Sequence, residues 1–170
     1  MLCDGNQDGG GWIVILRRKD GSFDFTLPSY NDYASSTQGS FEGEFFLALD
    51  FIHLLTSSTQ MELMIRLRDG LDTAWAYYDY FSVGPGSDKY RLSVSGFDPS
   101  SPAGDSLLYH NRMKLSSPDQ DNDSSTAHCA AIMQTSWWYR DCRLSNLLGI
   151  YGDEVNALGN FWSAWGGPAL

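Results

Sequence analysis

The sequence lacks any long apolar segment and is poor in basic residues. No run approaches the roughly 20 apolar residues that a membrane-spanning helix needs. Only 11 Lys and Arg residues stand against 21 Asp and Glu residues, which gives a formal net charge of −10. Such a surface repels phosphate groups, so nucleic acid and anionic membranes are poor candidate partners and membrane insertion is not expected. Cations, metal ions and neutral ligands such as sugars remain open.

Sequence signatures of catalysis are also absent. The chain contains no HExxH zinc motif, no GxSxG nucleophile elbow and no P-loop. Each of the three histidines, His53, His110 and His128, is interpreted as a structural residue rather than a ligand. A catalytic triad assembled from distant residues is the remaining enzymatic alternative, and we predict that the protein is not an enzyme.

Cysteines are few, and their number is odd. With three of them, at least one has no partner within the chain. Cys129 and Cys142 are separated by 12 residues, and a disulfide that closes this loop would contribute about 3 kcal/mol to stability. The residues alone leave two buried thiols as an alternative. Because no CxxC pair occurs, a cysteine zinc site is not expected.

The chain has two regions of different character. Its 170 residues suit one domain, and 42% apolar residues suffice for a core. Region 1–95 carries strand-like runs between turns, with strands predicted at 12–16, 61–68, 73–83 and 90–94 and a helix or helical turn within 41–55. In region 96–170 we expect irregular loops with one short helix. A segment so poor in regular structure needs a disulfide or a bound ion to hold it.

One acidic cluster, at residues 119–125, has the pattern of a cation-binding loop. Carboxylates alternate there at Asp119, Asp121 and Asp123, and alternating carboxylates on an irregular loop can point at one hard cation. Calcium takes six to eight oxygen ligands, including backbone carbonyls and water. The loop is not an EF-hand, because Ser124 and Ala130 stand where Gly and Glu would be needed. A solvated acidic turn is the alternative.

The motifs of the chain, taken in order, resemble those of fibrinogen C-terminal domains. Cys3-Asp4 and the run at 8–15, DGGGWIVI, are similar to the family opening CD…DGGGWTVIQRR. The resemblance continues to the end and covers essentially the whole chain. The further matching segments are GEFFL at 43–47, LRDG at 67–70, TAWAYY at 73–78, GDSL at 104–107, DND at 121–123, WWYRDC at 137–142 and NLLGIYG at 146–152.

The resemblance implies an α+β fold with a central twisted antiparallel sheet and a loop-rich, calcium-binding C-terminal lobe. It implies one domain over residues 1–170 that is truncated at both edges, which would explain the odd cysteine count. It also implies a disulfide between Cys129 and Cys142. The implied calcium ligands are the side chains of Asp121 and Asp123 and the backbone carbonyls of Ser125 and Ala127.

Lectin-like members of this family recognise acetyl groups in a pocket beside the calcium loop. The resemblance places that pocket at a cis peptide between Asp141 and Cys142, with Met133 and Asn156 at the positions of its aromatic walls. Arg143 stands where the family usually has a histidine. A guanidinium fork suits carboxylate, sulfate or phosphate, so the pocket is expected to favour acidic groups. The alternative is that Arg143 is a surface residue paired with Asp141.

The resemblance implies a secreted, extracellular protein, although no signal peptide is visible at the start of the chain. We expect a calcium-dependent, lectin-like recognition module of innate immunity that binds carbohydrate or acetylated or acidic surface groups. The alternative is a protein–protein module, like those of angiopoietins or fibrinogen, that binds a cell-surface receptor or matrix partner. The two functions share one fold, so the fold cannot choose between them. Oligomers are expected only through regions absent from the chain.

Overall fold

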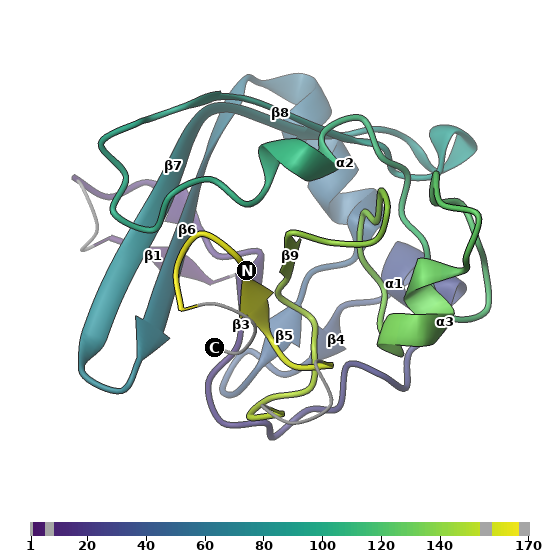
Figure 1. Ribbon diagram of the computed structural model, residues 1–170. Helices are drawn as coiled ribbons and strands as arrows, with labels where there is room; N and C mark the ends of the chain where they lie inside the picture. The colour runs from purple at the N-terminus through teal and green to yellow at the C-terminus, as the bar shows by residue number, and fades with distance from the viewer. Residues whose placement is uncertain (1, 6–8, 154–157, 167–170) are drawn as a thin grey trace.

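The computed structural model describes residues 2–5, 9–153 and 158–166. It has the predicted α+β composition, with antiparallel strand pairs and short helices (Figure 1). In chain order the elements are β1 (Cys3–Asp4), β2 (Trp12–Ile13), β3 (Leu16–Arg17), α1 (Tyr30–Ser35), β4 (Gln38–Gly39), β5 (Phe45–Phe46), α2 (Leu49–Ser58), β6 (Met61–Asp69), β7 (Asp72–Val83), η1 (Gly86–Asp88), β8 (Leu92–Phe97), η2 (Leu108–His110), α3 (Cys129–Met133), β9 (Ser145–Asn146) and β10 (Phe161–Trp162).

The longest strands form an antiparallel sheet in the order β6-β7-β8. The β6–β7 hairpin turns at Gly70, whose φ of +56° favours glycine, and it extends along the left of Figure 1. Side chains of β7 alternate between two faces, as a strand requires. Ala74, Ala76 and Tyr78 are buried, whereas Trp75 and Tyr77 lie half-buried on the opposite face. The strands predicted at 61–68 and 73–83 are thus confirmed as β6 and β7.

The elements around 12–16 and 41–55 differ from prediction. The single buried strand predicted at 12–16 is divided into β2 and β3, which are only half-buried, because β2 pairs with β1 and β3 pairs with β5. The helix predicted within 41–55 begins only at Leu49. Residues Phe45–Phe46 instead form β5, the central strand of the three-stranded sheet β3-β5-β4. Both differences arise from long-range strand pairing.

A buried carboxylate organises the turn after β3. The Glu44 side chain is 1% exposed, and its Oε1 accepts the backbone N–H groups of Lys19, Asp20 and Gly21 at 2.6, 3.1 and 3.1 Å. Burial acts to raise the pKa of Glu44. The hydrogen bonds from Lys19 and Gly21 and the nearby charge of Arg18 outweigh burial, so the pKa lies below its ordinary value. Glu44 is therefore a buried anion.

Arg18 connects this anion to the C-terminal half of the chain. Its Nε lies 3.4 Å from Oε1 of Glu44, and its guanidinium lies over the Phe25 ring at 4.4 Å. Its Nη1 donates to the carbonyls of Leu147 and Gly149 and to the Asn160 side chain, at 2.7 to 3.1 Å. The Glu44–Arg18 pair thus holds the N-terminal strands against the loops near residue 150.

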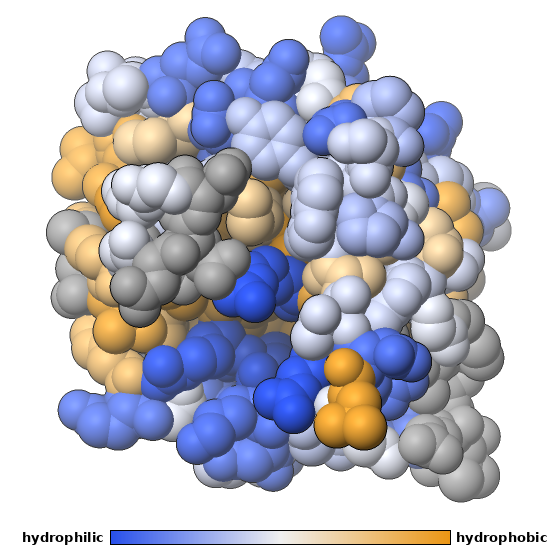
Figure 2. Space-filling view, turned by 90° about the vertical axis from the view of Figure 1, so that its left-hand side faces the viewer, coloured by the Kyte–Doolittle hydropathy of each residue, from blue (hydrophilic) through white to orange (hydrophobic). Residues whose placement is uncertain are grey.

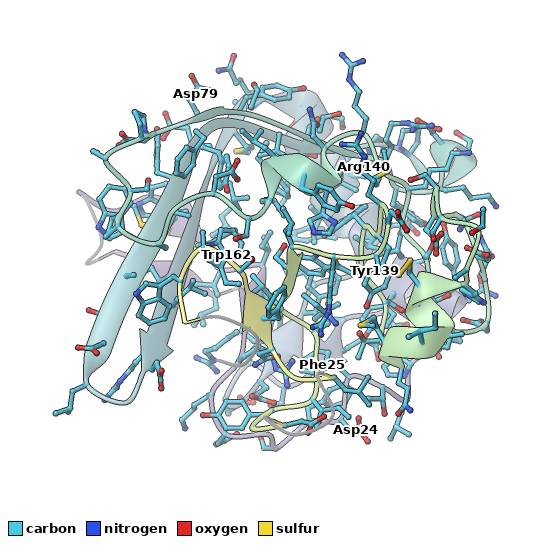
Figure 3. All side chains as sticks on the ribbon, viewed as in Figure 1. Asp24, Phe25, Asp79, Tyr139, Arg140 and Trp162 are labelled. Carbon is cyan, nitrogen blue, oxygen red and sulfur yellow. A yellow bond between two sulfur atoms is a disulfide. The ribbon has the colours of Figure 1, made fainter. Side chains whose placement is uncertain are left out.

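The C-terminal region is built from loops, as predicted. Its regular elements are short, and hydrogen bonds from buried aromatic side chains to the backbone take the place of long ladders. Trp162 donates from Nε1 to the carbonyl of Ala103 at 3.0 Å, and Trp138 donates to Tyr90 at 2.7 Å. Tyr139 and Trp162 are fully buried and lie near the centre of the view in Figure 3. Among the described residues, no helix is long and apolar enough to span a membrane.

Candidate functional site

The predicted cation loop follows a short bridge between Ser117 and Gln120. The Asp121 side chain is exposed, and one of its oxygens accepts the backbone N–H of Asp123 at 3.2 Å. Asp123 is half-buried, and its two oxygens accept the N–H groups of Ser125 and Cys129, both at 2.9 Å. The backbone of the loop therefore fixes the orientation of both carboxylates.

The two carboxylates influence each other. Burial raises the pKa of Asp123, and the neighbouring Asp121 carboxylate raises it further through its charge. The N–H groups of Ser125 and Cys129 act in the opposite direction but do not cancel the shift. Two carboxylates that repel each other in a small space are stabilised by a bound cation.

The carbonyls predicted as further calcium ligands are available for binding. Within the described chain, neither the Ser125 carbonyl nor the Ala127 carbonyl accepts a hydrogen bond from the protein. No group of three or more His, Cys, Asp or Glu side chains that could hold a metal occurs in the same residues. A metal here would thus depend on two carboxylates, these carbonyls and water. That donor set is all oxygen, which fits calcium, and calcium binding by the loop stays a prediction.

A disulfide joins the loop to the predicted pocket. Cys129, the first residue of α3, is bonded to Cys142, and their Cα atoms are 5.3 Å apart. The pairing is the one that the resemblance implied. Cys3, the remaining cysteine, is an exposed free thiol.

Hydrogen bonds also connect the loop to the segment before Cys142. Ser125 Oγ donates to the Asp141 carboxylate at 2.8 Å, and Ser124 Oγ donates to the Arg140 carbonyl at 2.9 Å. Ser125, whose carbonyl is one of the predicted calcium ligands, thus also contacts the segment before Cys142 through its hydroxyl. The disulfide and these bonds make the loop and the predicted pocket one structural unit.

Arg143 lies over an aromatic ring beside the disulfide. Its guanidinium is 4.5 Å from the centroid of Phe161, and burial lowers its pKa from the ordinary arginine value. The alternative in which Arg143 pairs with Asp141 is not observed, because no ion pair joins these two described residues. Met133 ends α3 and packs, half-buried, against the core. Asn156, the last predicted pocket residue, lies outside the described residues.

The prediction of a cis peptide between Asp141 and Cys142 is wrong for this structure. No described residue has a cis peptide bond. The trans form of a non-prolyl bond is favoured by about 2.5–4 kcal/mol, and here the surrounding groups accommodate it. The Asp141 carbonyl accepts a hydrogen bond from Tyr109 at 2.8 Å, and the Cys142 carbonyl accepts one from the N–H of Arg140 at 3.1 Å.

His110 supports the same segment, which confirms its interpretation as a structural residue; its particular partners were not predicted. The ring is fully buried, and its Nδ1 lies 2.7 Å from the carbonyl of Trp138. Its Nε2 accepts the backbone N–H groups of Leu144 and Ser145, both at 3.1 Å. These contacts assign the neutral ring with its proton on Nδ1. Burial accordingly lowers the pKa of His110 to about 4.

Comparison with known proteins identifies the class. The family model described as "Fibrinogen beta and gamma chains, C-terminal globular domain" matches residues 1–169. The chain therefore belongs to the fibrinogen C-terminal domain family, as the motifs indicated, and domains of this family in tenascins and angiopoietin-like proteins are binding modules rather than enzymes.

The relatives include tenascins and solved globular domains. Tenascin-R of Gallus gallus is 42% identical over 167 residues, which cover 98% of this chain and 12% of that protein. The fibrinogen-like globe domain of human ANGPTL6 superimposes with a TM-score of 0.91 at 38% identity, covering 98% of this chain and 76% of that one. Lamprey fibrin D-dimer, complexed with the peptide ligand Gly-His-Arg-Pro-amide, superimposes with a TM-score of 0.85 at 29% identity. The match covers 98% of this chain and 59% of that one. The chain thus spans a small fraction of the tenascin that it matches.

Proposed function

We propose that this chain is the recognition domain of an extracellular protein and that it binds a protein partner on a cell surface or in the matrix. The binding surface is the C-terminal lobe around residues 121–143. The observation that carries the proposal is the coupling of the acidic loop to residues 140–142 through Ser125, Ser124 and the Cys129–Cys142 disulfide. The tenascin and angiopoietin-like relatives, and the peptide bound to lamprey fibrin, support a protein ligand.

Calcium, when bound, neutralises the two neighbouring carboxylates of Asp121 and Asp123. The residues of the loop then do the rest. Ser125 donates to Asp141 and so fixes the segment before the disulfide, while Asp123 holds the N–H of Cys129 at the start of α3. A loop ordered by calcium would therefore also order the proposed binding surface, so calcium would promote binding without contacting the partner itself.

An extracellular location fits the chemistry of the chain. Disulfides persist in oxidising compartments and are rare in the cytosol, and Cys129–Cys142 joins the start of the short helix α3 to a loop. The tenascin relatives point to the same location. We therefore place the domain in a secreted protein, with its partner presented outside the cell.

The proposal predicts calcium-dependent binding that a protease abolishes. Fluorescently labelled domain is incubated with animal cells in calcium or in EDTA, after treatment of the cells with trypsin or with a mixture of glycosidases. We expect signal in calcium, loss of signal in EDTA, and loss on trypsin-treated but not on glycosidase-treated cells. The Asp121→Asn plus Asp123→Asn variant should behave like wild type in EDTA.

The matched control for that experiment replaces two acids far from the lobe. Asp69 and Asp72 face each other at the turn of the β6–β7 hairpin, and Asp69→Asn plus Asp72→Asn removes the same charge. This control should bind like wild type in calcium. Loss of binding only after glycosidase treatment would reject a protein partner, and binding that persists in EDTA would reject calcium dependence.

A lectin-like site for acidic groups is the second candidate, and the position of Arg143 favours it. The guanidinium lies over Phe161 beside the disulfide, and stacking on a ring keeps its planar fork oriented. A fixed cationic fork can bind a carboxylate or sulfate on a sugar, or an acidic side chain of a protein. Innate-immune recognition of microbial surface groups would follow from such a site.

Arg143→His is predicted to weaken binding of an acidic sugar about tenfold or more, because a charge-assisted hydrogen bond contributes roughly 1.5–3 kcal/mol. The same change should improve binding of N-acetylglucosamine. Affinities for sialyllactose and N-acetylglucosamine are measured by calorimetry in calcium. Arg17→His is the matched control and should bind both sugars like wild type, because Arg17 also lies over a ring, that of Phe45 at 5.4 Å, outside the proposed surface. Equal affinities for wild type and Arg143→His would exclude Arg143 from a sugar site.

A further inference from the structure

A cavity lies away from the acidic loop and the disulfide, on the outward face of the β6–β7 hairpin. Its volume is about 490 Å³, within the usual range of ligand pockets. In Figure 1 the hairpin lies on the left and α3 on the right, so the cavity is well separated from the loop discussed above. Its lining residues are Met64, Arg66, Thr73, Ala74, Trp75, Tyr77 and Asp98.

Strand register brings an aromatic surface to this cavity. Trp75 and Tyr77 alternate with the buried Ala74 and Ala76, so both rings face outward. On β6, Arg66 lies directly opposite Trp75, and Met64 lies opposite Tyr77. Figure 2 shows the molecule from the side of this hairpin, where polar and apolar side chains are interspersed. The cavity thus combines flat apolar rings with polar neighbours.

The polar groups of the cavity are of opposite kinds. Arg66 can only donate hydrogen bonds, and it is exposed with no hydrogen bond or ion pair to any described residue. Asp98 can only accept, and its two oxygens are oriented by the backbone N–H of Ser100 at 2.8 Å and the hydroxyl of Ser100 at 2.9 Å. One donor and one acceptor of opposite charge make the cavity close to neutral.

We propose that this cavity binds a neutral pyranose sugar. A pyranose ring offers apolar C–H faces for Trp75 and Tyr77, and its hydroxyls both accept from Arg66 and donate to Asp98. An anionic ligand would meet the Asp98 carboxylate, and a cationic ligand would meet Arg66. A wholly apolar peptide would displace the water that hydrogen-bonds to Arg66 and Asp98 and would offer no hydrogen bonds in its place. A ligand with hydroxyls around an apolar ring satisfies all of these groups together.

The test uses the whole domain and neutral sugars that carry neither acetyl nor acidic groups: methyl glucoside, methyl mannoside, methyl galactoside and lactose. Saturation-transfer NMR detects binding, and titration followed on the Trp75 indole N–H gives the affinity. We expect at least one sugar to bind in the millimolar range. Trp75→Ala and Arg66→Gln should each weaken it about tenfold or more.

Two matched controls lie on the same strands. Arg68→Gln removes a cation on β6 whose Nε is bonded to the Gly70 carbonyl, and Tyr80→Ala removes an exposed ring of β7 that does not line the cavity. Both should bind sugar like wild type. EDTA and the Asp121→Asn plus Asp123→Asn variant should also leave this binding unchanged, which separates the cavity from the proposed function of the lobe.

Three results would overturn the proposal. The first is no saturation transfer from wild type to any of the neutral sugars. The second is binding that Arg66→Gln leaves unchanged, since that variant alters only an exposed side chain and is expected to fold. The third is an acidic peptide, such as tetra-aspartate, that binds at the Trp75 indole more tightly than every sugar. If Trp75→Ala fails to fold, nuclear Overhauser contacts between the sugar and the Trp75 indole of wild type take its place.

Discussion

Replacing Glu44 with alanine is expected to lower the free energy of unfolding by about 3–5 kcal/mol, because removal of one partner leaves the other charge of a buried ion pair uncompensated. The Glu44 side chain is fully buried and that of Arg18 is 10% exposed. The substitution also leaves the N–H groups of Lys19, Asp20 and Gly21 without their acceptor. Urea unfolding followed by tryptophan fluorescence measures the loss.

Two further variants make this result specific. Glu44→Gln keeps the shape and one acceptor oxygen but removes the charge, so its loss should be smaller than that of Glu44→Ala. Glu42→Ala removes an exposed acid whose carboxylate accepts a hydrogen bond from the Ser40 hydroxyl, and it should change stability by less than about 0.5 kcal/mol. A Glu44→Ala protein as stable as Glu42→Ala would show that the Arg18–Glu44 pair does not join the two halves of the chain.

The second large effect is a loss of stability in acid through His110. The pKa of His110 is about 4 in the folded protein, against an ordinary value of 6.5 that applies to the unfolded chain. Burial lowers it because it disfavours the charged ring. Asp105 acts to raise this pKa and Arg140 to lower it. The unfolded chain therefore binds a proton that the folded chain does not. The resulting stabilisation is complete above pH 6.5 and is lost as the pH falls from 6.5 to 4, by about 3 kcal/mol in total.

The measurement compares wild type with His110→Gln by urea unfolding across that pH range. The substitution is expected to lower stability at neutral pH, because Nε2 no longer accepts from Leu144 and Ser145. The slope between pH 6.5 and 4 should also become shallower. All other titrating groups contribute to both proteins, so the difference between the two curves isolates His110. Parallel curves would contradict the neutral, buried assignment of the ring.

Local patterns predicted the parts of this fold that depend on near neighbours. Partial alternation of apolar and polar residues marked β6, the aromatic, β-prone composition of 73–83 marked β7, and the shortage of periodic structure after residue 96 marked a loop-rich lobe. The segment 12–16 was predicted less well. Its division into β2 and β3 depends on pairing with β1 and with β5, and Phe46 lies 30 positions beyond Leu16. A single-sequence pattern contains no information on such distant partners.

The candidate site shows the same limit. Asp121 and Asp123 are close in sequence, so their proximity followed from the alternation of carboxylates alone. Phe161, which lies against Arg143, is distant in the chain and had no motif to mark it. His110 contacts Leu144 and Ser145 across more than 30 positions. The cis peptide was inferred from the resemblance alone. In this structure the peptide bond between Asp141 and Cys142 is trans.

Calcium titration by isothermal calorimetry tests the central claim, that residues 121–127 form a calcium site that organises the lobe. Wild type should bind one calcium ion with a dissociation constant of about 10⁻⁴ to 10⁻³ M, the range of extracellular modules with few carboxylate ligands. Asp121→Asn plus Asp123→Asn should abolish the binding heat, and Asp69→Asn plus Asp72→Asn should leave it unchanged. No binding heat from wild type, or an equal heat from the Asp121 and Asp123 variant, would contradict the account.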